Sequence, residues 1–432
     1  MRNAFAHKGF RPLFAALATS MLGDSLMLIV LSMWVKSLTG SNAMAGLTFL
    51  CLVSPSLVAP LFGMFVDRVR RRPLLIWGNV ASALVVLPLL LVRDAGQVWL
   101  VWVVAFLYGI SFVVMPAGVN GMLKEMLPED RLVDANSALT TTKEGFRLIG
   151  PLAGAALFAA VGGGAVAALD ALSFLVAALV VARVRVREDA PARAEQHWWH
   201  EMTEGVRHVW HEPVLRHTLA ALGLTITVLG FAESAVFAVT DAFGKPVEFV
   251  GVVLTVQGVG ALVGGLTAPR VVRRVTEPGA LALALLALAG GQVGIALAPA
   301  LWAVLASVVL LGWSIPVLLI GFTTLMQRLT PGRLMGRVSA ATDVVLGTPQ
   351  TVGIALGAAL VSLVSYRAIF LTMAVVTVAA VGYLAITLRD RLFRAVAADA
   401  EAPAQAGAGT ATPTPTVVPA GVGVEVTTSV LE

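Results

Sequence analysis

The stretch GMFVDRVRRRP, residues 63–73, places one Asp and four Arg within six residues, between two long apolar runs. The chain as a whole avoids charge: 13% of its 432 residues are charged and 58% are hydrophobic, with a mean hydropathy of +0.88. A soluble protein is usually about 45–50% apolar and about a quarter charged. The composition therefore predicts an all-α integral membrane protein, in which this stretch is a short loop between two spans.

Breaks at Gly, Pro and charge clusters divide the chain into twelve apolar segments, each long enough to cross a bilayer as a helix. We expect these spans near 13–36, 44–65, 74–92, 97–122, 138–161, 164–183, 217–240, 247–268, 279–298, 300–326, 338–362 and 366–387. The single cysteine, Cys51, lies in an apolar run and excludes an intrachain disulfide.

With twelve spans both termini lie on one side, so alternate loops can be compared for Lys and Arg. The segments on the side of the termini hold 24 of the 30 basic residues, including the four Arg of the opening stretch. The opposite loops hold four, namely Lys36, Arg93, Lys245 and Arg367. Cytoplasmic loops retain the excess of positive charge, so this split predicts a cell-membrane protein with both termini in the cytoplasm. It also explains the net charge of +5 without a nucleic-acid partner.

The opening stretch recurs 202 residues later as GLTAPRVVRR, residues 265–274. The repeated positions pair Gly63 with Gly265, Arg68 with Arg270, Arg71 with Arg273, and Arg72 with Arg274. The same offset relates RLVDANSALT (131–140) to RLMGRVSAAT (333–342), which predicts two parallel six-helix halves. Such halves can rock about an axis along the membrane normal, as transporters do.

These features define the expected domain organisation. We expect a cytoplasmic N-terminus (1–12), a first six-helix bundle (13–183), a cytoplasmic linker with an amphipathic helix (184–216), a second six-helix bundle (217–387) and a cytoplasmic, largely disordered tail (388–432).

The opening stretch resembles the loop signature of the major facilitator superfamily, Gly-x-x-x-Asp-Arg-x-Gly-Arg-Arg. Gly63, Asp67, Arg68, Arg71 and Arg72 match it, while Arg70 stands where the family usually has Gly. LTGS (38–41) with AGL (45–47), ANSALTTTKEGFRLIGPLAGAALF (135–158) and DALSFL (170–175) resemble the drug and macrolide exporter branch. The resemblance implies the major facilitator fold and a transporter rather than an enzyme, with no cofactor or bound metal.

The resemblance also implies a gate at the cytoplasmic loops. In the family the loop Asp lies near the cytoplasmic start of span eleven, so Asp67 near Ser339 would hold the halves shut on that side. A carboxylate at a helix N-terminus is stabilised by the free N–H groups there. Pro269 replaces Asp in the second copy, which makes the clamp one-sided. The alternative is that the arginines only keep the loop in the cytoplasm.

Span five contains GFRLIGPLAG (145–154), which resembles the antiporter motif Gly-Pro-x-x-Gly-Gly. Gly150, Pro151 and Gly154 match, and Ala155 replaces the last Gly. Two interpretations remain open. The two glycines are four residues apart and allow close helix contact, or the motif has a role in coupling export to protons.

Charged residues within spans are costly and are therefore candidates for function. The candidates for proton coupling are Asp24, Glu144, Arg147, Glu233 and Asp343. Asp24 lies near the middle of span one, where it is either a reversible proton site or a fixed hydrogen-bond acceptor. Glu144 and Arg147 are i and i+3 and are expected to pair with each other. Asp170, near the outer end of span six, is expected to cap or orient a helix.

The linker segment QHWWHEMTEGVRHVWHEPVLRH (196–217) holds five of the six His residues. Helical spacing gathers Trp198, Trp199, Met202, Val206, Val209 and Trp210 on one face and His197, His200, Glu204, His208 and His211 on the other. We expect an amphipathic helix on the cytoplasmic membrane surface that ends before Pro213. A metal-binding or pH-sensing role for the histidines is the alternative to a simple polar face.

The leading hypothesis is a monomeric, proton-driven exporter of hydrophobic or amphiphilic small molecules. The cargo would bind in a central cavity between spans one, four, seven and ten. Candidate lining residues are Phe112, Met115, Trp313 and Phe322. Siderophores, natural products and lysolipids are alternative cargoes, and a transport-inactive receptor or scaffold on the same fold is the alternative from another class.

Overall fold

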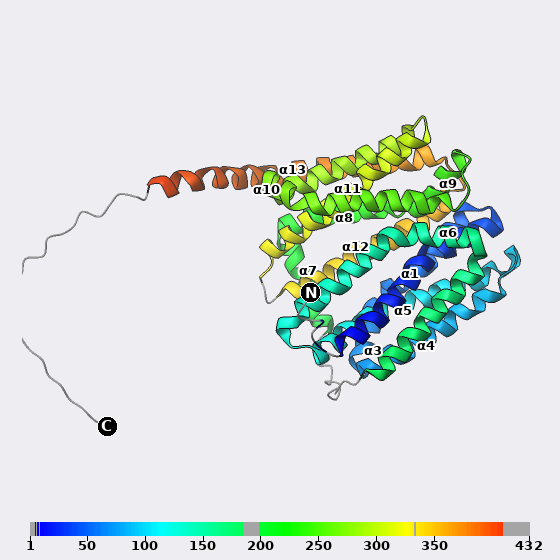
Figure 1. The fold of residues 1–432 in the computed structure, drawn as a ribbon. Coiled ribbons are helices and arrows are strands. Elements are labelled where there is room, and N and C mark those ends of the chain that lie inside the picture. The colour runs from blue at the N-terminus through cyan, green and yellow to red at the C-terminus, as the bar shows by residue number, and fades with distance from the viewer. Residues whose placement is uncertain (1–4, 6, 8, 185–197, 332–333, 409–432) are drawn as a thin grey trace, which may run out of the picture. The chain divides into compact units, whose positions relative to one another are not determined.

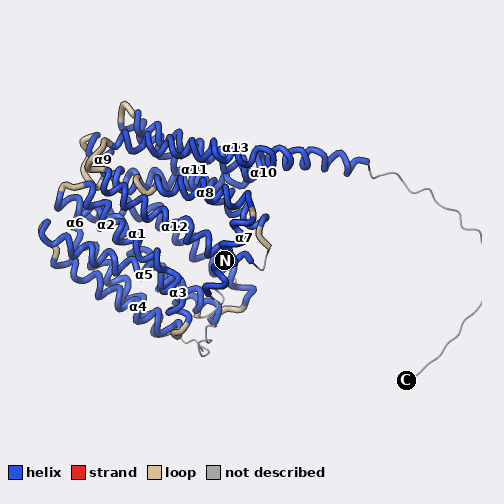
Figure 2. The backbone as a smooth tube through the Cα atoms, turned by 180° about the vertical axis from the view of Figure 1, so that it is seen from behind, coloured by secondary structure: helices blue, strands red, loops and turns tan. Residues whose placement is uncertain are grey.

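The computed structural model describes residues 5, 7, 9–184, 198–331 and 334–408. These residues form helices, turns and loops, with no strand among them (Figure 2). The chain divides into two compact units, Met1–Thr387 and Leu388–Glu432. All the contacts described below lie within the first unit.

The helices fall into two series that match the two halves of the sequence (Figure 1). The first series is α1 (Phe10–Thr39), α2 (Asn42–Val53), η2 (Ser54–Val58), α3 (Ala59–Asp67), α4 (Arg71–Val86), η3 (Leu87–Leu91), η4 (Ala95–Gln97), α5 (Val98–Met126) and α6 (Glu129–Arg183). The second is α7 (Trp198–His211), α8 (Pro213–Leu229), α9 (Ala232–Ala242), α10 (Phe249–Leu297), α11 (Leu301–Leu329), α12 (Met335–Leu360) and α13 (Tyr366–Ala408).

Among the described residues, nine helical segments are long and apolar enough to cross a membrane. Two of these are double. The 55 residues of α6 would extend roughly 80 Å as one straight helix, far beyond an apolar bilayer core of about 30 Å. Helical geometry breaks at Gly162 (φ 77°) in α6 and at Thr276 (φ 65°) in α10. Separating these halves and treating α2–η2–α3 as one crossing gives twelve. Because that last run contains no apolar helix of 18 residues, its crossing stays a prediction.

The helix ends repeat along the chain. The run from Pro213 to Ala242, made of α8 and α9, begins and ends 203 residues after α1 (Phe10–Thr39). Helix α11 (Leu301–Leu329) begins and ends 203 residues after α5 (Val98–Met126). One spacing for four helix ends supports the internal repeat that the arginine motifs indicate.

Each half has its own tightly packed helices. In the first half α6 packs along α1 and α4, and in the second α10 packs along α11. Figure 1 shows α10, α11 and α13 side by side, and Ile369 and Met373 of α13 share a buried cluster with residues of α10 and α11. Between the halves, α2 packs on α9 and α12, and α6 packs on α10.

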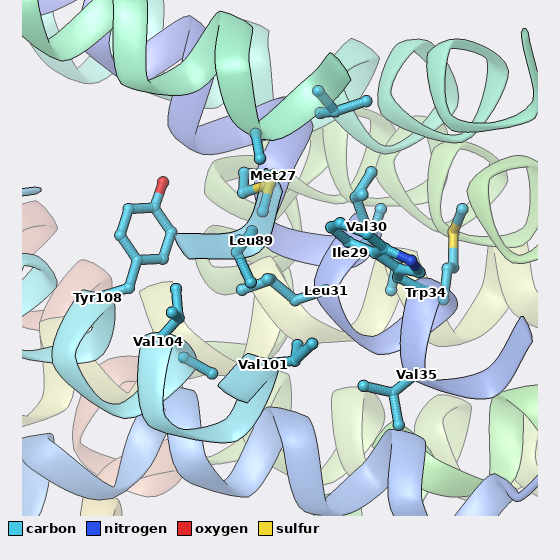
Figure 3. Packing of buried hydrophobic residues seen from close by; sticks show 14 of the residues in the cluster. Met27, Ile29, Val30, Leu31, Trp34, Val35, Leu89, Val101, Val104 and Tyr108 are labelled. Atoms are coloured by element: carbon cyan, nitrogen blue, oxygen red, sulfur yellow. The ribbon is translucent and has the colours of Figure 1, made fainter. Parts of the chain in front are cut away.

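The largest buried cluster of the first half surrounds α1 (Figure 3). It joins Met27 and Leu31 of α1 to Val101 and Val104 of α5, and it also includes residues of α9 and α10 from the second half. Tyr108 lies at the edge of this cluster, with its hydroxyl directed away from Val104 (Figure 3). The apolar packing of the first half therefore continues across to the second half at this level.

The first part of the tail is helical, since residues 388–408 continue α13. Their sequence is rich in Ala and Arg, which are strong helix formers. Residues 409–432 lie outside the described residues. The prediction of a largely disordered tail over 388–432 stays a prediction.

Candidate functional site

The first element of the site is a hydrogen bond between two helices of the first half. Tyr108 of α5, 1% exposed, donates its hydroxyl to Asp24 Oδ1 of α1 over 2.6 Å. Asp24 occupies the middle of α1, where the apolar sequence on either side keeps the helix in the bilayer. The ring of Phe112, one turn further along α5, lies edge-on to Tyr108 at 5.0 Å. This arrangement fixes the Asp24 carboxyl at membrane depth.

A second carboxyl, that of Asp170 in α6, interacts electrostatically with the first. Asp170 of α6 is 1% exposed, and a Cβ built on Gly23 would lie so close to its Oδ1 atom that the two would overlap. Its charge and that of Asp24 act on each other. Asp170 was expected to cap or orient a helix, but its two carboxyl oxygens accept no hydrogen bond of ordinary geometry. Asp170 is remote from Asp24 in sequence, so only the packing of α1 against α6 reveals the pair.

Charged side chains early in α6 act on carboxyls of both halves. Lys143 acts electrostatically on Asp24, and Arg147 acts on Glu233 in the first turn of α9. The predicted i, i+3 pair is present, with Arg147 Nη1 3.9 Å from Glu144 Oε2. Both side chains of this pair are more than half exposed, so the pair contributes little to stability.

Asp343, the remaining coupling candidate, is an exposed residue of α12. Neither Asp24 nor Asp170 has it as an interaction partner. Four of the five candidates therefore lie on α6 or interact with one of its charged side chains, and Asp343 does neither.

The glycines of the antiporter-like motif lie directly against α1 at the residues after Asp24. A Cβ on Gly150 would come within 2.7 Å of the Ser25 side chain, and one on Gly154 would overlap the Leu26 carbonyl oxygen. The motif therefore does provide close helix contact, as the packing interpretation requires. Its place beside Asp24 leaves the coupling interpretation open.

One stripe along α10 shows how the contact between the halves changes from end to end. Gly251, Gly258 and Gly265 are seven residues apart and so share a helix face. A Cβ on Gly251 would lie 2.7 Å from the Pro151 carbonyl oxygen, and one on Gly258 would lie 2.7 Å from Leu148 Cδ1. A Cβ on Gly265, two turns nearer the arginine-rich loops, would meet no atom within 4 Å. The contact of α10 with α6 thus ends toward the arginine-rich loops.

The opposite end is closed by polar and apolar contacts. Lys36 Nζ, at the end of α1, donates to Asp241 Oδ2 of α9 over 2.6 Å and to the Gly40 carbonyl oxygen over 2.9 Å. Gly46 of α2 is packed so closely on Ser234 of α9 that a Cβ there would overlap the serine side chain. We call this the lysine end, and the end with the Arg68–Arg72 loop the arginine end.

The loop arginines contact their own half. Arg71 donates to the Val66 carbonyl oxygen, and a Cβ on Gly121 of α5 would lie 2.5 Å from Arg71 Nε. Arg72 donates to the Ala182 carbonyl oxygen at the end of α6 over 2.5 Å, where a cation interacts favourably with the helix C-terminus. In the second copy, Arg270 donates to the Leu266 carbonyl oxygen of its own helix over 3.5 Å.

The clamp between Asp67 and the start of span eleven stays a prediction. The side chain of Asp67 lies outside the described residues, and a Cβ on Gly265 at this end would meet no atom within 4 Å. The gating role of Arg68, Arg273 and Arg274 also stays a prediction, because no contact between described residues shows them at a closed gate.

Of the four candidate lining residues, Phe112 is 38% exposed and remains a candidate. Met115 places its Sδ 2.6 Å from where a Cβ on Gly78 of α4 would be, so it packs inside the first half. Trp313 Nε1 donates to Thr267 Oγ1 over 2.9 Å between α11 and α10, and Phe322 is 4% exposed. Phe322 is therefore buried against protein in this structure, whereas the lining roles of Met115 and Trp313 stay predictions, because sequence spacing does not fix which helix face meets a neighbour.

The amphipathic linker helix forms as α7 and ends before Pro213, as predicted. Its polar side packs on the protein: Glu204 pairs with Arg337 of α12, and His208 Nε2 lies 3.2 Å from the Leu329 carbonyl oxygen. Val206 and Trp210, on the apolar side, are 42% and 65% exposed. The side chain of His200 and all of His197 lie outside the described residues, so the metal-binding alternative stays a hypothesis.

Fold and site together define a polytopic α-helical membrane protein with two repeated halves and ionisable residues between them. A family model for the Major Facilitator Superfamily matches residues 13–348, and the chain belongs to that superfamily. It is a multi-pass transporter fold, as the resemblance implied.

Several relatives are efflux proteins. The chain is 28% identical to the multidrug efflux pump Tap of Mycolicibacterium fortuitum over 376 residues, which cover 84% of this chain and 91% of that pump. It is 27% identical to the uncharacterized MFS-type transporter YfiS of Bacillus subtilis (strain 168), over 62% of this chain and 65% of that protein, just under two thirds of the relative. Macrolide efflux protein A of Streptococcus pyogenes is 24% identical over 46% of this chain and 50% of its own. The resemblance to the drug and macrolide exporter branch is confirmed.

Solved structures share the fold at low identity. A mutant of the nucleoside transporter NupG aligns with a TM-score of 0.71 at 12% identity, covering 88% of this chain and 99% of its own. A bacterial homologue of the iron transporter ferroportin in the inward-facing state aligns with a TM-score of 0.67 at 17% identity, covering 89% and 98%. These likenesses establish the fold alone.

Proposed function

We propose that the protein exports hydrophobic or amphiphilic small molecules across the cell membrane by proton antiport with alternating access. The observation that carries this proposal is the graded contact along α10: close at Gly251, close at Gly258 and absent at Gly265. Two halves that touch at one end and part at the other can rock about the contact between them. The relatives named as efflux pumps favour export as the direction.

The excess of Lys and Arg assigns the arginine end and both termini to the cytoplasm. With that orientation, the structure represents a state open to the cytoplasm and closed at the lysine end. The cargo would enter between α1, α5, α8–α9 and α11, where Phe112 provides an exposed aromatic surface. The low share of charged residues in these helices suits an apolar cargo.

Protons provide the simplest energy source. Asp24 lies at membrane depth, and Lys143 and Arg147 of the neighbouring α6 give charged groups whose interactions change when a carboxyl gains or loses a proton. An ionisable group at that depth is energetically costly and is therefore a candidate for function. We assign the proton exchange to Asp24, with Glu233 as the candidate carboxyl of the second half.

Membrane vesicles with the cytoplasmic face outward test the proposal. Cargo leaves the cytoplasm as protons enter it, so an acidic vesicle lumen should drive uptake of cargo and a protonophore should stop it. A panel of dyes, macrolides, siderophores and lysolipids would identify the cargo class. Absence of any gradient-driven uptake, together with cysteine accessibilities that do not respond to cargo or pH, would instead favour a receptor or scaffold.

A further inference from the structure

Asp170 is a buried acid with no role in the proton exchange proposed for Asp24. It is 1% exposed, and neither of its carboxyl oxygens accepts a hydrogen bond of ordinary geometry. The hydroxyls of Tyr108 and Ser173 interact with its carboxyl, but each donates its ordinary hydrogen bond elsewhere: Tyr108 to Asp24 Oδ1 over 2.6 Å and Ser173 to the Asp170 backbone carbonyl over 2.8 Å. A buried carboxylate whose neighbours donate their ordinary hydrogen bonds elsewhere is costly to keep ionised, which favours a bound proton or cation at this site.

The surroundings of Asp170 point to a proton shared with Asp24. The two carboxyls act on each other across the contact of α6 with Gly23, and Tyr108 donates its hydroxyl to Asp24. Two carboxylates that repel each other in a low-dielectric site are both ionised only at a high energetic cost. Carboxyl pairs in this situation hold one proton that belongs to the pair rather than to either residue.

No cation among the described residues acts on the Asp170 carboxyl. Helix α5 contributes Tyr108, and the later part of α6 contributes Asp170 itself. The earlier part of α6 contributes Lys143, whose charge acts on Asp24. Helix α2, which also packs on α1, has no acidic or basic residue. Among the described residues, no three His, Cys, Asp or Glu side chains gather closely enough to hold a metal ion.

We propose that Asp24 and Asp170 form a two-carboxyl site that binds one transported proton, with Tyr108 holding Asp24 in place. This inference rests on the proposed proton antiport and places its coupling site inside the first half. When the proton binds, one O–H bond forms and the charge of the pair changes from −2 to −1; when it leaves on the other side, the reverse occurs. Gly150 and Gly154 lie in close contact with Ser25 and Leu26, so the charge change occurs next to the contact of α1 with α6.

Asp170→Asn is the decisive variant, compared with Asp24→Asn and with the double variant. Asp170→Glu retains a carboxyl, and Asp94→Asn is the matched control because Asp94 is an exposed N-cap of η4 that Asn also caps. The full chain in lipid vesicles is assayed for gradient-driven uptake and for cargo exchange without a gradient. Infrared difference spectroscopy against pH follows the carboxyl C=O absorption as a readout independent of transport.

Both single Asn variants should lose gradient dependence while retaining exchange, and the double variant should lose no more than either. The infrared titration of the carboxyl left in each variant should differ from the wild type by roughly one pH unit or more, because its partner is gone. Asp170→Glu should restore gradient dependence in part, and Asp94→Asn should match the wild type.

Unchanged coupling and an unchanged carboxyl signal in Asp170→Asn would overturn the inference while leaving Asp24 as a single proton site. A carboxyl signal that responds to Na⁺ or Mn²⁺ at constant pH would replace the proton with a metal ion. Failure of the wild type to show gradient-driven uptake would instead reject the antiport proposal itself. If Asp170→Asn does not fold, loss of the pH dependence of the carboxyl infrared signal in Asp170→Glu decides against a shared proton.

Discussion

Lys36 and Asp241 join the last turns of α1 and α9, 2.6 Å apart, although they lie in different halves of the chain. The Lys36 side chain is 10% exposed and that of Asp241 is 44% exposed. The Lys36 side chain is mostly buried, unlike those of surface ion pairs. Loss of the Asp241 charge would leave the Lys36 ammonium without a matching charge, although its hydrogen bond to the Gly40 carbonyl oxygen would remain. The pair therefore stabilises the closed state of the lysine end.

Asp241→Asn should weaken that closure by about 1–2 kcal/mol, between the values for exposed and buried pairs. The lysine end should then open roughly five to thirty times more often. A Val250→Cys probe in a Cys51→Ser background measures this, because Val250 is fully buried between the halves. Its labelling by an impermeant thiol reagent should accelerate accordingly. Lys245→Met, an exposed lysine at the same end, is the control; equal acceleration there would contradict the prediction.

The stripe on α10 predicts opposite outcomes for one substitution at two positions. Gly251→Ala places a methyl 2.5 Å from Ala155 Cβ and should cost about 1–3 kcal/mol through overpacking. Gly265→Ala meets open space and should stabilise its helix by about 0.5–1 kcal/mol. Thermal unfolding of the purified protein in detergent compares the two. Similar melting temperatures for both variants would show that α6 and α10 do not separate as described.

Gly154→Ala tests the contact beside Asp24. The new methyl would overlap the Leu26 carbonyl oxygen, so α1 must move at that point. We expect uptake to fall at least about tenfold while membrane insertion stays normal, since the helix itself favours Ala over Gly. Gly145→Ala on the same helix meets nothing within 4 Å and should transport normally. Transport by Gly154→Ala at the wild-type rate would separate this contact from function.

The linker helix should be coupled to α12 through Glu204 and Arg337. Both side chains are just over one third exposed, so the pair itself should contribute about 0.5–1 kcal/mol. A double-mutant cycle with Glu204→Ala and Arg337→Ala, followed by thermal unfolding, measures that coupling. Gly205→Val provides a stronger test, because its side chain would overlap the Arg337 carbonyl oxygen. Additive effects in the cycle would show that α7 is not held by this pair.

The orientation inferred from the arginines is testable by topology reporters. Fusions at residue 1 and after residue 387 should both report a cytoplasmic location, and a cysteine replacing Lys245 should be labelled from outside. Reporters on opposite sides of the membrane would require an odd number of crossings and would remove the two-fold repeat as the basis of transport.

Much of the fold could be predicted because it depends on local composition. Apolar runs of about 20 residues, broken by arginine loops, define the membrane helices, and the motif around Asp67 and its copy near Arg270 indicate both family and repeat. Asp24, Glu144 and Arg147 were identified because charge is rare in such spans. The break at Gly162 was expected between spans five and six, since Gly accepts a left-handed backbone.

The sequence alone indicated a helical membrane protein with two repeated halves and predicted which side faces the cytoplasm, because hydropathy and charge are properties of each segment by itself. Tertiary structure decided which segments meet: Asp170 with Gly23, Lys36 with Asp241, and Gly251 with Pro151. Each of these depends on helix rotation and on contacts between residues far apart along the chain, which period and composition do not specify. The separation at Gly265, and with it the end that is open, is likewise a property of how the halves pack.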